Sequence, residues 1–205
     1  RTAINYPFNG LIDEVRIYNR ALNPSEVTAL YEYAPGPLAY WDLNEGVGTT
    51  IYDKSGNGLN GVFGIGNSSP EWNLGKIGKG LKINTSGQFV KVFLGPTWAS
   101  KFYTNSAGKT FTYSMWFKSS NINNGTQYLL TDNSPCNNQG NFSISLQNGI
   151  PHFAYYNAGG GGDHRFTPSF TLQNNTWYHL TWTKTFGELG VKAYLNGISQ
   201  TIIND

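Results

Sequence analysis

The sequence has little charge, one cysteine and no long apolar run. Of its 205 residues, 14 are Lys or Arg and 12 are Asp or Glu, or 13% of the chain. These charges are scattered and form no basic cluster, so the electrostatic footprint of a nucleic-acid-binding protein is missing. The single cysteine, Cys136, excludes an internal disulfide and a thiolate-rich metal site. No apolar run approaches the roughly 18 residues of a membrane span, so we expect no insertion into a membrane.

Aromatic side chains, Gly, Asn, Ser and Thr are abundant instead. Hydrophobic residues make up 39% of the chain and aromatic residues 15%, enough for a core, which excludes a disordered chain. The length suits one large all-β domain, or one domain with a piece of another. A surface of small polar residues is typical of secreted β-proteins, so we expect an extracellular or cell-surface location. Because the first residue is Arg1 and not Met, we also expect a longer parent polypeptide.

Most of the chain is predicted to form short strands. Polar and apolar residues alternate over 110–117 and again over 177–183, as in half-buried strands. Further candidate strands are 142–146, 152–156 and 191–195. Three dipeptides that favour hairpin turns lie between these candidate strands: Asn124-Gly125, Asn148-Gly149 and Asn196-Gly197. Many strands with short turns predict an all-β fold, an antiparallel sandwich or jelly roll.

One short helix is predicted near the N-terminus. Residues 23–26 supply an N-cap Asn, a Pro at the first helical position and a Glu at the third. The apolar residues that follow at helical spacing are Val27, Leu30 and Tyr31. The Pro/Gly-rich stretch 34–37 is the best linker candidate. It separates residues 1–33, too few to fold alone, from residues 38–205.

Six segments together resemble the laminin-G-like, concanavalin A-like lectin/glucanase domain family. Residues 8–22 are similar to its closing strand, and the capped helix after them fits the same comparison. The other segments, in the family's order, are 39–46, 53–61, 78–83, 111–118 and 175–197. The resemblance implies a jelly-roll β-sandwich of the concanavalin A type, in which 38–205 lacks its last strands.

The family's ending therefore precedes its opening in this chain, and three arrangements explain that order. In a tandem array, residues 1–33 finish one repeat and residues 38–205 begin the next. In a circular permutation, the N-terminal strand closes its own sandwich. In a head-to-tail fibre, the strand is donated to a neighbouring copy. In each case the strand needs a partner, so neighbouring copies of the module are expected partners.

Calcium is the cofactor that the sequence supports best. Asp53 and Asn57 sit in a Gly-rich turn, where side-chain and backbone oxygens can converge on a hard cation. By alternation Asp13 points towards the core, where a carboxylate needs a partner or a metal. The resemblance implies that the strand of Asp13 lies close to the opening turn and to Asp53. In the simpler interpretation, Asp53 only caps an Asx-turn and Asp13 pairs with Arg16 or bonds to backbone.

A carbohydrate site is predicted in the loops. The segment 157–166 reads as a Gly-rich flexible loop after a strand that ends in two tyrosines. The candidate ligands of a sugar there are Tyr156, Asp163, His164 and Arg165. Asp132 lies in a second polar loop with Asn133 and Asn138. The alternative interpretation is that the tyrosines are ordinary strand residues and the charged side chains are solvated.

Catalysis is poorly supported by the sequence. Glycosidases on this fold use two carboxylates roughly 5–10 Å apart, and no strand carries such a pair of acids. No G-x-S-x-G motif is present for a serine nucleophile. The sequence therefore predicts a non-catalytic extracellular module, one repeat of a larger surface, adhesion or fibre-forming protein, stabilised by calcium. The alternatives are a lectin-like module that presents a secreted enzyme or toxin to glycans, and a processed hydrolase.

Overall fold

The structure is a computed structural model that describes residues 20–32, 36–64, 69–84, 88–92, 110–131, 142–156, 163–185 and 190–204. Its N-terminal elements are α1 Pro24–Glu32, β1 Thr50–Ile51, β2 Gly61–Phe63, β3 Glu71–Leu74, β4 Lys79–Lys82 and β5 Val90–Val92. The later strands are β6 Phe111–Phe117, β7 Thr126–Thr131, β8 Phe142–Gln147, β9 Ile150–Tyr156, β10 Asp163–Pro168, β11 Tyr178–Lys184, β12 Val191–Leu195, β13 Ile198–Gln200 and β14 Ile202–Asn204. Within these ranges no helix is long and apolar enough to cross a membrane.

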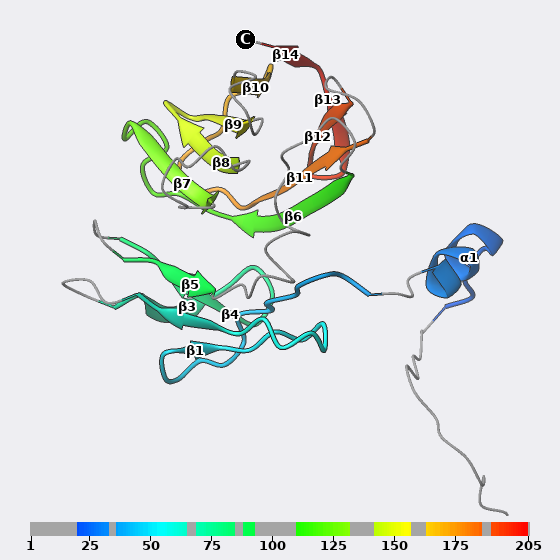
Figure 1. Cartoon of the computed structure of the whole chain (residues 1–205), viewed down its shortest axis with the longest axis horizontal. Coiled ribbons are helices and arrows are strands. Elements are labelled where there is room, and N and C mark those ends of the chain that lie inside the picture. Colours follow the sequence, from blue (N-terminus) through cyan, green and yellow to red (C-terminus); the bar gives the residue numbers. More distant parts are fainter. Residues whose placement is uncertain are drawn as a thin grey trace, which may run out of the picture.

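Strands β6 to β14 form an antiparallel β-sandwich (Figure 1). One sheet has five strands in the order β14-β10-β9-β8-β7, and the other has four in the order β13-β12-β11-β6. The longest ladder joins β6 to β11, with Tyr178 opposite Phe117 and Lys184 opposite Phe111. The predicted all-β antiparallel sandwich with one short N-terminal helix is therefore confirmed.

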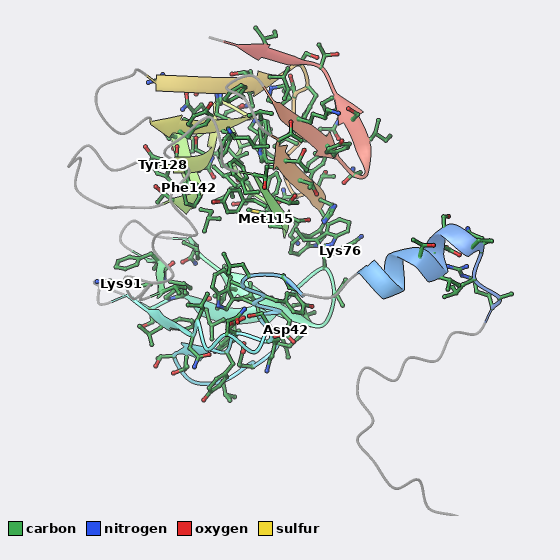
Figure 2. The ribbon with its side chains drawn as sticks, turned by 45° about the vertical axis from the view of Figure 1, so that its right-hand side comes forward. Asp42, Lys76, Lys91, Met115, Tyr128 and Phe142 are labelled. Carbon is green, nitrogen blue, oxygen red and sulfur yellow. The ribbon has the colours of Figure 1, made fainter. Side chains whose placement is uncertain are left out.

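The core lies between the two sheets, where side chains fill the space (Figure 2). The inward residues of β8, β9 and β10 meet those of β11 and β12, as strand alternation requires. Their largest fully buried members are Trp182, Tyr155, Phe153 and Phe166. Alternation also turns Lys184 inward at the end of β11, where its ammonium lies 5.6 Å from the centre of the Tyr155 ring. The aromatic content read from the sequence is thus concentrated in this core.

Two of the three predicted turn dipeptides form tight hairpins. Asn148-Gly149 joins β8 to β9, and Asn196-Gly197 joins β12 to β13, all four residues having positive φ angles of 50° to 81°. Asn and Gly are the residues that adopt this left-handed region at low cost, which explains the preference. Asn124-Gly125 instead belongs to the connection that leads from β6 in one sheet to β7 in the other.

A smaller body, which we call the small lobe, consists of strands β1 to β5 and the loop residues from Leu38 onward. It contains a three-stranded sheet, β1-β2-β5, and a β3-β4 hairpin. Ile51, Leu59 and Phe63 are its buried apolar residues, and they are not part of the sandwich core. The ammonium of Lys76, in the β3–β4 turn, lies 5.1 Å from the ring centre of Trp116 on β6, at the side of the small lobe that faces the sandwich (Figure 2).

Helix α1 begins with the predicted cap. The side chain of Asn23 accepts a hydrogen bond from the Glu26 N–H at 2.9 Å, and Glu26 accepts one from the Asn23 N–H at 2.9 Å. This reciprocal pair is a capping box. A salt bridge of 2.8 Å from Arg20 to Glu26 adds to the cap and lowers the pKa of that carboxyl, together with the bond from Asn23. The predicted start of the helix is confirmed.

Candidate functional site

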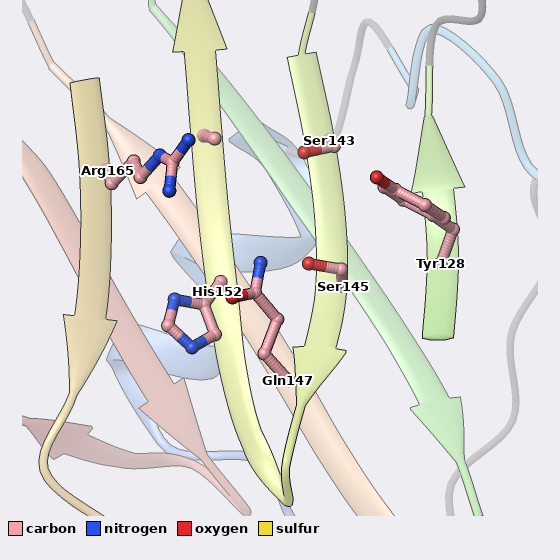
Figure 3. A pocket seen from close by; sticks show the side chains of 7 residues that line it. Tyr128, Ser143, Ser145, Gln147, His152 and Arg165 are labelled. Atoms are coloured by element: carbon pink, nitrogen blue, oxygen red, sulfur yellow. The ribbon is translucent and has the colours of Figure 1, made fainter. Parts of the chain in front are cut away.

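A polar hollow lies on the outer face of the five-stranded sheet (Figure 3). The side chains that line it come from four neighbouring strands, β7, β8, β9 and β10, and alternate with core residues along each of them. The lining residues are Tyr128, Ser143, Ser145, Gln147, His152, Ala154 and Arg165. The register places Arg165 opposite Ala154 and Ala154 opposite Ser143, and in the next row His152 opposite Ser145 and Ser145 opposite Tyr128.

The hollow exists because small residues form its floor and large ones its walls. Ala154 and Ser145 are buried on the two central strands, although they point away from the sandwich core. Tyr128 rises beside them with 65% of its surface exposed. The enclosed volume is about 90 Å³. Complete ligand pockets are usually about 300 Å³ or more, so this hollow takes part of a ligand.

Several polar groups in the hollow lack a protein partner among the described residues. The side chains of Tyr128, Ser143, Ser145 and Gln147 make no hydrogen bond there. Ser145 is only 2% exposed, and Figure 3 shows its hydroxyl directed into the hollow. Because this hydroxyl opens into the hollow, a molecule bound there could complete its hydrogen bonds.

Two further side chains give the hollow its charge and its fixed geometry. The Nδ1 atom of His152 lies 3.0 Å from the hydroxyl of Thr167 on the neighbouring strand, which orients the imidazole ring. The guanidinium of Arg165 extends from β10 towards Ala154 (Figure 3). Hydroxyls, an amide, an imidazole, a guanidinium and an exposed aromatic ring are the groups that bind polar, ring-shaped ligands such as sugars.

The structure describes one side chain of the residues predicted to bind a sugar. That residue is Arg165, which lines the hollow. The predicted flexible loop 157–166 is too long by four residues, because β10 already begins at Asp163 and pairs with Tyr156 and Tyr155 of β9. This pairing extends the β9–β10 ladder and overrides the loop-like composition. The side chains of Tyr156, Asp163 and His164, and the whole of Asp132, lie outside the described residues.

Most of the hollow was missed by sequence reasoning. Tyr128, Ser143, Ser145, Gln147 and His152 were not predicted as ligands of a sugar. The alternation of the strands does contain a signal. At outward positions of β8 and β9, the small residues Ser143 and Ala154 become neighbours once the two strands pair. That signal needs the register, since Ser145 and His152 become neighbours only through the Asn148-Gly149 turn.

The carboxylate of Asp53, in the small lobe, accepts four hydrogen bonds. Its Oδ1 atom accepts hydrogen bonds from the N–H groups of Tyr40 at 3.0 Å and Ser55 at 2.9 Å. Its Oδ2 atom accepts from the Ser55 hydroxyl at 2.7 Å and the Leu59 N–H at 3.0 Å. Burial acts to raise the pKa of Asp53, but the bonds from Tyr40, Ser55 and Leu59 outweigh it and hold the pKa below its ordinary value. Asp53 thus holds the backbone of Tyr40 and Leu59 next to the turn that contains Ser55.

These contacts bear on the predicted calcium site. A carboxylate offers about four acceptor positions, and four protein donors already use those of Asp53. Asn57 donates from Nδ2 to the Leu38 carbonyl at 3.1 Å, while its Oδ1 atom accepts no bond among the described residues. Those residues contain no group of three or more His, Cys, Asp or Glu side chains placed to share a metal. Asp13 lies outside them, and calcium binding stays a prediction.

The outer face of the four-stranded sheet carries a serine–histidine contact. The hydroxyl of Ser114 lies 2.9 Å from Nε2 of His179 and 3.1 Å from the hydroxyl of Thr181. The ring of Trp116 lies 5.0 Å from the His179 ring. In the described part of the sandwich no carboxylate bonds to the other ring nitrogen of His179, so the third member of a catalytic triad is missing there.

The family model described as the concanavalin A-like lectin/glucanases superfamily (Laminin_G_3) matches residues 97–203, slightly more than half of the chain. No curated protein matches the sequence. The matched span contains β6 to β13, all but the last residue of β14, and the described residues that line the hollow.

Proposed function

The chain belongs to the concanavalin A-like lectin/glucanase superfamily, and from this membership we propose that it is a carbohydrate-binding module that uses the hollow on its five-stranded sheet. The superfamily supports a carbohydrate-binding or adhesion-type module as the general role. The hollow supports the more specific assignment because it combines an exposed aromatic ring with polar groups that have no protein partner.

The observation that carries this proposal is the hydroxyl of Ser145, which points into the hollow and has no hydrogen-bond partner among the described residues. The residue is only 2% exposed, so the hollow is the side from which a ligand can reach this hydroxyl. Its neighbours Ser143 and Gln147 are also without side-chain partners among the described residues. Three such groups on one strand, open to the same hollow, match the several hydroxyls that a sugar ring presents on one edge.

Binding is a better assignment than hydrolysis, although the superfamily includes glucanases. Glycosidases need an acid and a second carboxylate flanking the scissile bond. None of the described residues that line the hollow is Asp or Glu. Binding without turnover, in an extracellular setting, is therefore the role that we assign.

The proposed sugar binding is compatible with the assembly of neighbouring modules that the sequence predicts. Strand exchange between neighbouring copies would involve the segment 8–22, most of which lies outside the described residues. Sugar binding by the hollow and assembly through that segment are compatible, since an adhesion protein needs both. Light scattering of the full chain over a range of concentrations tests the assembly independently of any glycan.

A glycan array followed by titration calorimetry tests the proposed site. We expect binding of at least one oligosaccharide, and we expect Tyr128→Ala to weaken it about five- to tenfold because an aromatic face is lost. Ser145→Val keeps a strand-forming residue, but it removes the hydroxyl and fills the floor, so it should also weaken binding. The control is Tyr52→Ala, which removes a tyrosine that is 51% exposed from the small lobe, against 65% for Tyr128. Absence of binding, or equal effects of Tyr52→Ala and Tyr128→Ala, would overturn the proposal.

A further inference from the structure

The polar groups of the hollow follow one strand, and this arrangement indicates how a saccharide lies on the sheet. We infer that the ligand is a linear, uncharged oligosaccharide that runs along β8 and is bound through units in its interior, with the chain continuing past the hollow at both ends. This inference rests on the proposed carbohydrate-binding function and adds the class of ligand to it.

Three polar side chains form a row along β8, which we call the β8 row. Ser143, Ser145 and Gln147 are alternate residues of this strand, and all three line the hollow. Figure 3 shows them one after another along the strand. At about 3.3 Å per residue, the β8 row is about 13 Å long. A single pyranose ring is shorter than that, so only a ligand of several units can contact the whole row.

The exposed aromatic ring stands beside the middle of the β8 row and not at one end. Tyr128 pairs with Ser145, the central member of the row, and is 65% exposed. A sugar ring packed against Tyr128 therefore has Ser143 on one side along the strand and Gln147 on the other. A terminal sugar would leave one of these two groups without a ligand, whereas an interior unit has a neighbour over each of them.

The volume of the hollow agrees with a chain that lies across it. About 90 Å³ corresponds to roughly three water molecules at about 30 Å³ each, enough for one substituent such as a hydroxymethyl group. Ser145 and Ala154 form the buried floor of this space, so it takes a substituent of the central unit. The rest of the chain then stays on the outer face, over the half-buried side chains of Ser143 and Gln147.

The chemistry of the β8 row favours hydroxyl groups as ligands. A serine hydroxyl and a glutamine amide both donate and accept hydrogen bonds, as the hydroxyls of a sugar do. The row has no formal charge, and its side chains make no hydrogen bond among the described residues. His152 is bonded to Thr167, and Arg165 has another interaction within the protein, so neither is counted here as a ligand. Recognition therefore depends on three uncharged groups and one aromatic ring.

Oligosaccharides of increasing length provide the test. The full chain is titrated calorimetrically with cello-, manno-, xylo- and laminari-oligosaccharides of one to six units. In at least one series, the affinity should rise at least tenfold from the monosaccharide to the tetrasaccharide, and less than twofold from there to the hexasaccharide. Reduction of that hexasaccharide to its alditol should change its affinity less than twofold, because interior units and not the chain end are bound.

Two variants of the β8 row locate the chain on the sheet. Ser143→Ala and Gln147→Ala should each weaken binding of the hexasaccharide about three- to tenfold, because each removes a hydrogen-bonding group. A disaccharide can lie over Ser145 and the remaining neighbour, so its affinity should fall less than twofold. The controls Ser199→Ala and Gln200→Ala remove the same residue types from β13 of the other sheet, and melting curves confirm that each variant folds.

The results of these titrations distinguish the class of ligand from the proposed function. If no series gains affinity with length, if the variants weaken disaccharide and hexasaccharide equally, or if the glycan array finds only ligands outside the four series, the inference is overturned while the proposed function stands. If nothing binds in the titrations or on the array, the proposed function itself fails.

Discussion

Asp53 organises the loop around it through charge-assisted hydrogen bonds. The four donors come from Tyr40, Ser55 and Leu59, which are separated along the chain but converge on one carboxylate. Leu59 is buried, so the same bonds fix the position of a core residue of the small lobe. This explains why an acid occurs at that position in a chain with only 12 acidic residues.

Substitution of Asp53 should therefore destabilise the small lobe, and the effect should depend on pH. Asp53→Ala leaves several donors without their acceptor, so we expect a loss of about 1–3 kcal/mol in the free energy of unfolding at pH 7. The pKa of Asp53 is lowered in the folded protein, so its charge stabilises fully above the ordinary carboxyl pKa of about 3.9. That contribution disappears as the pH falls through the lower, folded value.

Urea titrations from pH 7 down to pH 2 measure this difference between wild type and variant. We expect the curves of wild type and Asp53→Asn to converge at the acid end. Glu71→Gln is the control, since Glu71 makes only an exposed salt bridge of 3.4 Å to Lys82 and should change stability by less than about 1 kcal/mol. Equal, pH-independent effects of the two substitutions would contradict this role of Asp53.

Single residues of the hollow show why the candidate site could not be read from the sequence. Ser143, Ser145 and Ala154 look like ordinary polar or small strand residues when considered alone. Their meaning arises from pairing, which sets them side by side as a floor between Tyr128 and Arg165. Sequence reasoning favoured a Gly-rich loop with charged residues, and Arg165, the member of that set whose side chain the structure describes, lines the hollow.

At the scale of elements, strands and turns were predictable because their signals are local. The alternation over 110–117 and 177–183 corresponds to β6 and β11, whose inward residues form the core. The predicted strand 191–195 coincides with β12. The beginning of β10 was not predictable, because Asp163 follows four glycines and its strand conformation comes from pairing with β9. Pairing between strands is a tertiary effect that composition does not encode.

The loop of Asp53 and Asn57 is also the element in which calcium was predicted. If an ion binds there, calcium should raise the melting temperature and a chelator should lower it again, because a ligand of the folded state stabilises that state. Asn57→Ala and Asp13→Asn should both abolish the shift. The hydrogen bonds of Asp53 need no ion, so identical melting curves with calcium and with chelator would overturn the calcium prediction and leave the loop explained by those bonds alone.

At the scale of the whole molecule, the described residues form two separate apolar cores. In that part of the chain the sandwich core draws on residues from Phe111 to Ile202, whereas Ile51, Leu59 and Phe63 are buried in the small lobe. The contact between Lys76 and Trp116 links the two bodies, and an exposed cation–π pair contributes only about 0.5–1 kcal/mol. Sequence reasoning treated residues 38–205 as one sandwich that lacks its last strands, and this division stays a prediction. A local pattern does not reveal which buried residues share a core.

Because the described residues form two separate cores, we expect the two bodies to unfold in two steps. We expect scanning calorimetry of the full chain to show two transitions. Leu180 is fully buried in the sandwich, so Leu180→Ala should lower that transition by roughly 10 °C or more, because removing such a side chain costs about 2–5 kcal/mol. Leu59→Ala should lower only the other transition, and Lys76→Ala should shift each by a few degrees at most. One cooperative transition displaced equally by Leu180→Ala and Leu59→Ala would mean that the two bodies share a single stability, and the glycan site would then depend on the small lobe for its folding.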